Sequence, residues 1–565
     1  LGISAPALNH NGANGRNAFY FNGTELINAR WPNADKSGEQ CFVGAEGAEL
    51  TKEEQGKYNG NGQPTKMKYK DETGRSKLWQ FKPGDMYAGG AFAYLWARQA
   101  VKLESLDTEN CILKTAENLN YGQSTYTAKD DRYLYFENIF EEIDVPGESY
   151  LDRDAGILYF YPVGDVEGAT LSLSTLGSTM LYNEGSAYVT FDGINIKESA
   201  SDAMLLGGSS HHITVKNATV NGIGGYGVRI WAPNTTIENN HFYNIANTAI
   251  LIKGGNRATL ESSGSVVKNN LIHSCSAWAN SAIEVEDGVG QVISHNKIYE
   301  YDMGGVRLSN VNNVVIEYNE FYDCQQLNAD GGVIYFGRNV SDLGNIIRNN
   351  YFHHIGNKIG AHGQQSIFTD DGNVGPAIYG NIFYKAGQPD FPIKTHAGQF
   401  HRIYNNIFVD NTTGSFMQMW PAGWTRAKDK REGVGRWFFY IQDGGDLLDC
   451  GSTNLWSGRK DLVLSDTWYD YYTKTEPTGQ WKSMLENYIN KDVNAKLEAA
   501  YAKYNKDTPK SQMTELVSLV NTLPNEYTNR LYNNAYIGVT NQVTGGNYSN
   551  ENNAEFSLEE GKSLF

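Results

Sequence analysis

The chain has 565 residues, of which 40% are hydrophobic and 20% charged, and its formal net charge at pH 7 is −17. This acidic balance argues against a nucleic-acid groove or an anionic membrane surface as the main partner. No run of about 18 apolar residues occurs, so no membrane-spanning helix is predicted, and no signal peptide is recognisable in the sequence.

Residues 1–180 lack the repeat that dominates the rest of the chain. They contain strand-like runs such as AFYFNGTELINARWPN, and alternating apolar residues on either side of Asp152–Gly156 predict a β-hairpin. We expect this region to form a β-rich N-terminal cap that covers the edge strand of the following domain, which spans residues 181–565.

Nine similar segments follow, in which an apolar residue recurs five positions on. They start at Phe191, Val215, Ile237, Val267, Ile293, Ile316, Ile347, Ile378 and Ile403. The starts lie about 22 to 31 residues apart, which is the spacing of a solenoid coil. One such repeat cannot bury its own apolar face, so the repeats must stack.

Each period holds a second apolar strand, for example VRIW, IEVE and VIYF. Both strand types alternate with a period of two, and neither has the 3.6 period of a helix. The sequence therefore predicts an all-β right-handed parallel β-helix, in which inward side chains stack on their counterparts about 4.8 Å away.

An Asn stands three positions into each later segment. The column comprises Asn240, Asn270, Asn296, Asn319, Asn350, Asn381 and Asn406. Asn tolerates left-handed backbone, and its amide can bond to the Asn above and below. We interpret the column as a structural turn ladder.

Cys275 and Cys324 hold equivalent places two rungs apart, roughly 10 Å, which is too far for a disulfide. We expect both to be buried thiols. Residues 480–523 are rich in helix-favouring Ala, Leu, Glu and Lys and predict a helical insertion, after which NRLYNNAYIGV resumes the strand pattern near residue 529.

The outward positions of the second strands form two columns on one sheet face. One reads Arg229, Leu251, Glu284, Arg307, Ile334, Phe368, Lys394, Gln418, and the other reads Trp231, Lys253, Glu286, Ser309, Phe336, Asp370, His396, Trp420. Charged residues in the centre and Trp at both ends are typical of a substrate groove. The alternative is an ordinary exposed sheet with ion pairs between neighbouring strands, such as Glu284 with Arg307.

Asp370, Asp371 and Gly372 form the sharpest local motif. Two like charges held this close raise at least one pKa, as a general acid requires. The alternative is a plain Asp-Gly turn. His396 stands one rung from Asp370 in the same column, within reach of a hydrogen bond, and His353, His354 and His362 precede the Asp-Asp strand in a segment that could wall the groove.

Glu284 and Glu286 are alternate residues of one strand, so both point outward about 7 Å apart, which suits inverting glycoside cleavage. The pair suits a Ca²⁺ site equally well. Glu286 and Asp370 are three rungs apart, roughly 14 Å, so they form an acid/base pair only if side chains and loops converge.

Several longer segments, among them ARWPN (29–33), YLDRDAGILYFYP (150–162), GVIYFGR (332–338) and TDDGNVGPAIYGNIFYKAG (369–387), resemble secreted bacterial right-handed β-helix carbohydrate-active enzymes. The nearest likeness is to glycoside hydrolases of the α-L-fucosidase, xylanase or β-xylosidase type. The resemblance implies carboxylate chemistry on the exposed sheet. β-Xylosidase-like relatives carry a second carboxylate one rung further on, where this chain has Lys394 and His396.

The resemblance leaves three functions open. The first is a periplasmic or secreted glycosidase that cleaves a plant or algal polysaccharide. The second is a polysaccharide lyase that uses Lys394, Arg307 or Arg338 on a uronate. The third is a non-catalytic glycan-binding solenoid.

For the glycosidase we predict three catalytic residues, Asp370, Asp371 and Glu286. The predicted substrate-binding residues are Glu284, Arg307, Arg338, Lys394, His396, His362, Trp231, Phe336 and Trp420. We expect a monomer that requires no cofactor, with Ca²⁺ at Glu284 and Glu286 as the one alternative.

Overall fold

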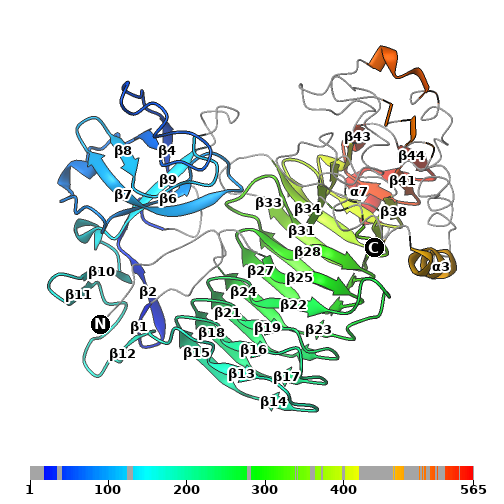
Figure 1. Ribbon diagram of the computed structural model, residues 1–565, viewed down its shortest axis with the longest axis horizontal. Helices are drawn as coiled ribbons and strands as arrows, with labels where there is room; N and C mark the ends of the chain where they lie inside the picture. Colours follow the sequence, from blue (N-terminus) through cyan, green and yellow to red (C-terminus); the bar gives the residue numbers. More distant parts are fainter. Residues whose placement is uncertain are drawn as a thin grey trace.

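The computed structural model describes residues 18–34, 41–123, 132–275, 281–337, 341–356, 363–370, 375–396, 401–418, 465–475, 510–515, 529–545 and 548–563, with a few isolated residues between them. Within these ranges the chain forms a β-rich N-terminal region and a long solenoid (Figure 1).

The solenoid consists of three sheets of eleven strands each, and neighbouring strands within each sheet run parallel (Figure 1). The first sheet contains β13 (Leu181–Asn183), β16 (Met204–Leu206), β19 (Val228–Ile230), β22 (Ile250–Gly254), β25 (Ser281–Val289), β28 (Gly304–Asn312), β31 (Gly331–Gly337), β34 (Gln364–Asp370), β37 (Ile393–His396), β40 (Thr413–Gln418) and β43 (Asn541–Gly545). The second sheet contains β14 (Thr190–Asp192), β17 (Thr214–Lys216), β20 (Thr236–Glu238), β23 (Val266–Lys268), β26 (Val292–Ser294), β29 (Val315–Glu317), β32 (Ile346–Arg348), β35 (Ala377–Tyr379), β38 (Arg402–Tyr404), β41 (Asn529–Tyr532) and β44 (Tyr548–Glu551). The third sheet contains β15 (Asn195–Ser199), β18 (Thr219–Ile223), β21 (His241–Ile245), β24 (Leu271–Cys275), β27 (Lys297–Tyr301), β30 (Glu320–Cys324), β33 (Tyr351–Gly356), β36 (Ile382–Gln388), β39 (Ile407–Val409), β42 (Ala535–Ile537) and β45 (Ala554–Phe556). The predicted parallel β-helix is confirmed.

The core of the solenoid is a continuous column of apolar side chains that stack from coil to coil. One of its files consists of aromatic rings, in which Phe321, Phe352, Phe383, Phe408 and Tyr536 stack with centroids 4.9 to 5.0 Å apart. Inward residues that repeat at the same place in each coil therefore become contacts between coils, as the sequence pattern predicts.

The Asn column is a hydrogen-bonded ladder at the turn between the second and third sheets. The backbone N–H and side-chain Nδ2 of Asn296 both donate to Oδ1 of Asn319, and the same groups of Asn319 donate to Oδ1 of Asn350. The ladder continues through Asn534 to Asn553. One detail of the prediction was wrong: the left-handed backbone falls on the residue before each ladder Asn, as at Tyr318 with φ 55°.

The two cysteines also occupy the predicted places. Cys275 pairs with Tyr301, and Tyr301 pairs with Cys324, so the two thiols are two strands apart. Both are free and buried, and burial raises the pKa of each thiol to about 12.

The N-terminal region contains two sheets. A seven-stranded sheet has the order β3 (Arg30–Trp31), β9 (Tyr133–Glu137), β4 (Val43–Gly47), β5 (Lys66–Tyr69), β8 (Ile112–Thr115), β7 (Arg98–Asp107) and β6 (Tyr87–Ala91), and it closes because β6 also pairs with β9. A five-stranded sheet has the order β11 (Ile157–Phe160), β10 (Glu148–Asp152), β2 (Thr24–Asn28), β1 (Phe19–Phe21) and β12 (Leu171–Leu173). The short 3-10 helices η1 (Arg75–Leu78) and η3 (Phe140–Glu142) flank them. The hairpin predicted around Asp152–Gly156 is β10–β11.

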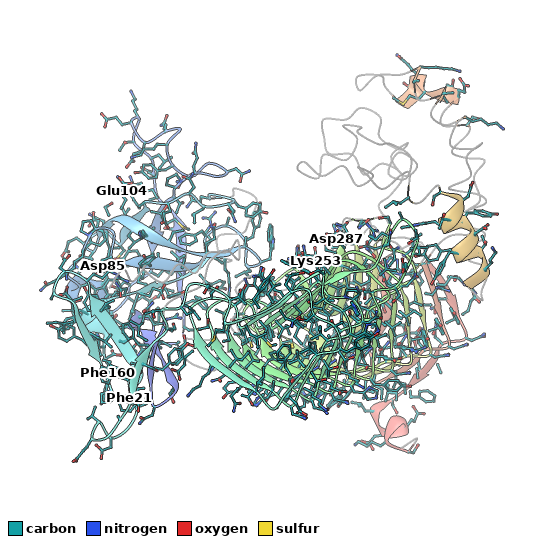
Figure 2. The ribbon with its side chains drawn as sticks, turned by 60° about the horizontal axis from the view of Figure 1, so that its bottom comes forward. Phe21, Asp85, Glu104, Phe160, Lys253 and Asp287 are labelled. Carbon is teal, nitrogen blue, oxygen red and sulfur yellow. The ribbon has the colours of Figure 1, made fainter. Side chains whose placement is uncertain are left out.

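These two sheets contact the solenoid at different heights. In the five-stranded sheet, where Phe21 and Phe160 pack together (Figure 2), Tyr20 donates a hydrogen bond to the carbonyl of Gly222 near the first coils. The seven-stranded sheet lies against the middle coils, where the Arg98 guanidinium donates to the carbonyl of Leu327. The N-terminal region therefore lies along the side of the solenoid, which was not predicted from the sequence, and the covering of the edge strand stays a prediction.

The described α-helices lie in the C-terminal part of the chain. Helix α3 (Asp466–Thr475) precedes the predicted insertion and packs Trp468 and Tyr472 against solenoid turns, with hydrogen bonds to the carbonyls of Arg257 and Leu343. The 3-10 helix η5 (Lys510–Gln512) falls within the predicted range 480–523, most of which lies outside the described residues, and α7 (Leu558–Lys562) follows the last strand. Among the described helices, none has the length and apolar composition needed to cross a membrane.

A buried histidine makes the solenoid sensitive to acid. His401 is fully buried between Thr369 and Asn529, and burial lowers its pKa from 6.5 to about 4. Because the unfolded chain binds this proton at higher pH than the folded chain, the contribution to stability is present above about 6.5 and is lost as the pH falls towards 4.

We expect this group to contribute roughly 3 kcal/mol to the difference in unfolding free energy between the two ends of that window. Urea unfolding of the wild type and of His401→Gln at several pH values measures it. The variant should show a shallower pH dependence between about 6.5 and 4, and equal slopes in the two proteins would contradict the assignment.

Candidate functional site

A cleft of about 460 Å³ lies between the seven-stranded sheet and the middle strands of the first solenoid sheet. Its N-terminal wall is formed by Trp96, Asn120 and Tyr121. On the solenoid side it is lined by Ser281, Met303, Gly304, Arg307, Leu308, Ser309, Gln325, Asp330, Gly331, Gly332, Tyr335, Gly337 and Asp370. The cavity is therefore lined by two carboxylates, those of Asp330 and Asp370, and by the aromatic side chains of Trp96, Tyr121 and Tyr335.

Asp370 ends strand β34 on the outer face of the sheet, and both of its carboxylate oxygens accept hydrogen bonds. The Tyr335 hydroxyl donates to Oδ2 at 2.9 Å, and Nδ1 of His396 donates to Oδ1 at 2.9 Å. Tyr335 stands on β31 and His396 on β37, so the two donors come from the strands on either side of β34. This trio fixes the orientation of the carboxylate in the cleft.

The floor next to Asp370 is open because small residues occupy the same column. Gly337 pairs with Asp370, and Ser309 pairs with Glu286 two strands away. A Cβ at Gly337 would lie 2.8 Å from the Cβ of Asp370, so no larger residue fits there without moving the carboxylate.

Asp330 is the second carboxylate in the cleft, and it was not predicted from the sequence. It immediately precedes β31, and Nζ of Lys394 lies 3.1 Å from its Oδ1. The side chain of Asp330 is 55% exposed, whereas that of Lys394 is 18% exposed and lies over the Phe368 ring at 4.3 Å. The Asp-Gly-Gly triplet directly before an apolar strand was the available indication.

Glu284 lies outward on β25 but is buried, and burial raises the pKa of this carboxyl, partly offset by Arg307. Its partner in the neighbouring strand, Arg307, is exposed and lines the cleft. In turn, Arg307 pairs with Tyr335 in the next strand. Arg307 is therefore the cation that a bound ligand can reach on the cleft floor.

Glu286 is not among the residues that line the cleft. Its Oε2 lies 2.8 Å from Nζ of Lys253, and Lys253 lies close to Asp287 on the surface of the solenoid (Figure 2). The predicted Ca²⁺ site at Glu284 and Glu286 stays a prediction. Among the described residues, no three His, Cys, Asp or Glu side chains gather as a metal site.

The two described aromatic residues that were predicted to contact substrate, Trp231 and Phe336, both lie outside the cleft lining. Trp231 is 37% exposed and packs against Arg229 at 5.6 Å, but it lies away from the cleft at the other end of the column. The prediction for Phe336 was wrong: Tyr335, not Ile334, pairs with Arg307, and Phe336 pairs with the inward Leu308 in the core. Phe336 therefore cannot stack on a sugar ring.

The remaining predicted residues fall elsewhere. Asp371, Arg338, His362 and Trp420 lie outside the described residues. His353 and His354 belong to β33 in the third sheet, where His353 stacks on Tyr322 with centroids 4.8 Å apart, so they do not wall this cleft.

The N-terminal wall of the cleft is an aromatic cluster. The Trp96 ring stacks on Tyr94 at 5.1 Å and meets Tyr121 edge-on at 4.7 Å. The Trp96 and Tyr121 side chains line the same cavity as Arg307 and Asp370. A flat, ring-bearing wall opposite polar groups is suited to a ligand with apolar faces and hydroxyl edges.

Comparison with known proteins agrees with the handedness of the coils. The family model "Right handed beta helix region" matches residues 179–264 and 260–355. A search of curated protein sequences gives no significant match. Among solved structures, a glycoside hydrolase is similar over 72% of this chain and 76% of its own, at 12% identity and a TM-score of 0.47. XylC in complex with xylose covers 85% of this chain and 74% of its own, at 10% identity and a TM-score of 0.35. The surface adhesin PfbA of Streptococcus pneumoniae covers 41% of this chain and 66% of its own, at 12% identity and a TM-score of 0.31.

Proposed function

We propose that the protein is a glycoside hydrolase whose active site is the cleft, with Asp370 as the carboxylate that acts at the reacting carbon or on its water. The observation that supports this most is the environment of Asp370, which lines the cleft with both oxygens held by Tyr335 and His396. Enzymes that hydrolyse glycosidic bonds use a pair of carboxyl groups on either side of the scissile bond.

Asp330 is the second carboxyl group in this proposal. Protonated, it gives its proton to the departing sugar oxygen as the bond to the reacting carbon breaks, and water supplies the hydroxyl that replaces it. The nearby Lys394 ammonium favours the ionised form of Asp330, so in this proposal bound substrate separates the pair before Asp330 takes up its proton. After proton transfer the same ammonium stabilises the carboxylate that remains. Asp371, the next residue after Asp370, stays a prediction as a third acidic group.

The substrate in this proposal is a fragment of a plant or algal polysaccharide, and the enzyme acts as a secreted or periplasmic monomer. Trp96 and Tyr121 supply ring faces for a sugar, and Arg307 supplies a donor for its oxygen atoms. His396 contacts Asp370 and acts as a positioning residue. Lys394 acts through Asp330 in the same way.

Reaction in water enriched in the oxygen-18 isotope distinguishes hydrolysis from elimination. A hydrolase incorporates one solvent oxygen into each new sugar end, which mass spectrometry detects. A panel of neutral and uronate-containing polysaccharides should yield labelled, saturated fragments. Labelling in none of the products would contradict the proposal, and no product at all would favour a non-catalytic glycan-binding protein.

A polysaccharide lyase is the second candidate, and the position of Arg307 favours it. An exposed guanidinium one strand from the Tyr335 phenol can neutralise the carboxylate of a uronate while a base removes the neighbouring proton. β-Elimination gives unsaturated, unlabelled products that absorb ultraviolet light. Lys394, which the sequence also suggested for a lyase, is paired with Asp330.

Removal of the Trp96 ring should weaken substrate binding. Contact between an aromatic face and a sugar contributes about 1–2 kcal/mol, so Trp96→Ala should raise KM by roughly tenfold and change kcat less. Steady-state kinetics measures both constants. Tyr188→Ala is the matched control, because Tyr188 is 75% exposed and is not among the residues that line the cleft. Equal KM values in the two variants would contradict the assignment of this wall.

A further inference from the structure

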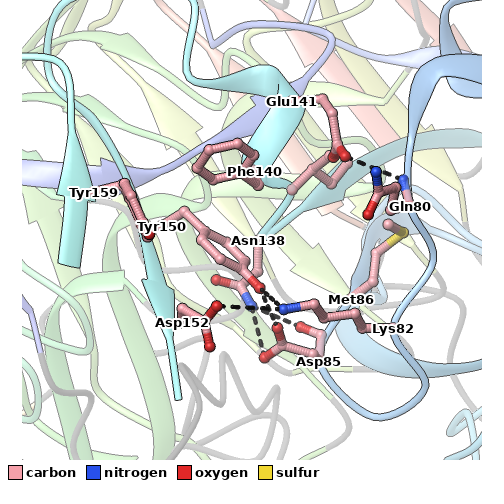
Figure 3. A pocket seen from close by; sticks show the side chains of 11 residues that line it. Gln80, Lys82, Asp85, Met86, Asn138, Phe140, Glu141, Tyr150, Asp152 and Tyr159 are labelled. Carbon is pink, nitrogen blue, oxygen red and sulfur yellow. Dashed lines mark hydrogen bonds and ion pairs between the residues drawn. The ribbon is translucent and has the colours of Figure 1, made fainter. Parts of the chain in front are cut away.

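A second pocket, of about 250 Å³, lies within the N-terminal region between the two β-sheets (Figure 3). Its residues come from the loop before β6, from η3 and the two residues before it, and from the β10–β11 hairpin. It shares no lining residue with the cleft described above. Its volume is below the range of about 300–1,000 Å³ that holds drug-sized ligands, so it suits one or two sugar-sized rings.

The floor of this pocket is a polar network around Asp85 (Figure 3). The carboxylate of Asp85 accepts hydrogen bonds from Asn138 at 3.0 Å, Tyr150 at 2.9 Å and Arg153 at 2.6 Å. The three hydrogen bonds occupy the carboxylate of Asp85, and this carboxylate fixes the position of the Tyr150 hydroxyl. Asp85 is therefore a support for the pocket.

Two charged groups beside this network remain within reach of a ligand. Nζ of Lys82 lies 3.1 Å from the Tyr150 hydroxyl and 3.6 Å from Oδ2 of Asp152. The Lys82 side chain is 46% exposed, so its ammonium group can also contact a third partner. The ammonium can donate to one hydroxyl of a sugar while the neighbouring carboxylate accepts from the adjacent hydroxyl.

The other wall of the pocket consists of partly exposed aromatic rings. Phe140 is 48% exposed and Tyr159 is 38% exposed, and their rings meet edge-on with centroids 5.0 Å apart. Phe140 also packs edge-on against Tyr150 at 5.8 Å. Exposed rings held rigidly beside ordered polar groups favour a ligand with both an apolar face and hydroxyl edges.

We propose that this pocket is a non-catalytic binding site for a neutral saccharide. The sugar would stack on Tyr159 and Phe140 and place adjacent hydroxyls on Lys82 and Asp152. A neutral ligand is favoured because three of the described lining residues, Asp85, Glu141 and Asp152, carry carboxylates, and the cation among them is Lys82. If the cleft hydrolyses glycans as proposed above, this site keeps the polymer on the enzyme between cleavage events.

Calorimetric titration of the full chain tests the proposal, with cellohexaose and xylohexaose as neutral probes and hexagalacturonate as the acidic probe. The chain carries Asp370→Asn so that the probes stay intact. Tyr159→Ala should weaken binding of a neutral probe by at least about tenfold, because the stacking face is lost. Tyr161→Ala is the matched control: Tyr161 follows the same strand, is 43% exposed and does not line the pocket.

Two further variants separate binding from folding. Tyr159→Phe should keep the affinity because it keeps the ring, and Lys82→Met should reduce it while leaving the aromatic wall intact. In a chain with Asp370 restored, Tyr159→Ala should leave hydrolysis of a short soluble substrate unchanged. The calorimetric titration tests the binding site even if the cleft hydrolyses no polysaccharide.

Three results would overturn the proposal. The first is equal affinity for every neutral probe in Tyr159→Ala and Tyr161→Ala. The second is Tyr159-dependent binding of hexagalacturonate in preference to the neutral probes. The third is the absence of measurable binding of any neutral probe to the chain that carries Asp370→Asn alone.

Discussion

Replacement of Asp370 by Asn should reduce kcat by about a hundredfold to ten-thousandfold, which is the range of a lost general acid or base. The amide of Asn has nearly the same shape and still accepts a hydrogen bond from Tyr335 or His396, so the fold should persist. The amide oxygen cannot take up a proton from water or attack the sugar as a carboxylate does. Initial rates at saturating substrate measure the loss, and cooperative urea unfolding checks the fold.

Asp192→Asn is the control for this variant, because Asp192 is an Asp of the second sheet that pairs with Lys216 and Asn217 away from the cleft. Tyr335→Phe and His396→Gln extend the test. Each removes one donor to Asp370, so each should lower kcat less than Asp370→Asn and should also shift the pH profile of kcat/KM. Full activity of Asp370→Asn would remove Asp370 from the mechanism.

Replacement of Asn319 by Ala should lower the free energy of unfolding by about 3–5 kcal/mol. The Asn319 amide donates to the carbonyls of Ile293 and Glu317 at 3.0 Å, and its Oδ1 accepts two bonds from Asn296. Alanine leaves several of these buried groups without a partner, and each such group costs about 1–3 kcal/mol. Urea unfolding followed by circular dichroism measures the change.

The end of the ladder provides the matched comparison. Asn553 is only half-buried, and among the described contacts it accepts from Asn534 and donates to the Leu531 carbonyl at 3.3 Å. Asn553→Ala should therefore cost clearly less than Asn319→Ala, because water can replace the lost bonds. Equal losses at the two positions would mean that the ladder does not stabilise the interior coils through its buried amides.

The fold could be predicted because the solenoid repeats its physical requirements in every coil. Inward Ile and Phe and the ladder Asn recur with one period, and each coil imposes the same neighbours on the next. The Asn ladder and the buried thiols of Cys275 and Cys324 follow directly from that period. The left-handed residue before each ladder Asn is itself Asn in several coils, as at Asn239 and Asn349, but is His295 and Tyr318 in others, so the ladder column was assigned the left-handed backbone of its neighbour.

The site was only partly predictable, for two physical reasons. In VIYF all four residues are apolar, so a period of two cannot decide which side faces inward, and Phe336 was placed outward in error. The aromatic wall at Trp96 and Tyr121 comes from a region without repeats, and only the three-dimensional contact of the two regions brings it over Asp370. By contrast, the Asp370–His396 contact was predicted, because both stand in one column of adjacent strands.

The most direct test of the account is the crystal structure of Asp370→Asn soaked with the oligosaccharide that the wild type cleaves best. The account predicts a sugar chain in the cleft, with one ring against Trp96 and a glycosidic oxygen close to Asn at position 370 and to Asp330. A well-ordered sugar bound only at another surface, with the cleft filled by solvent, would contradict the account.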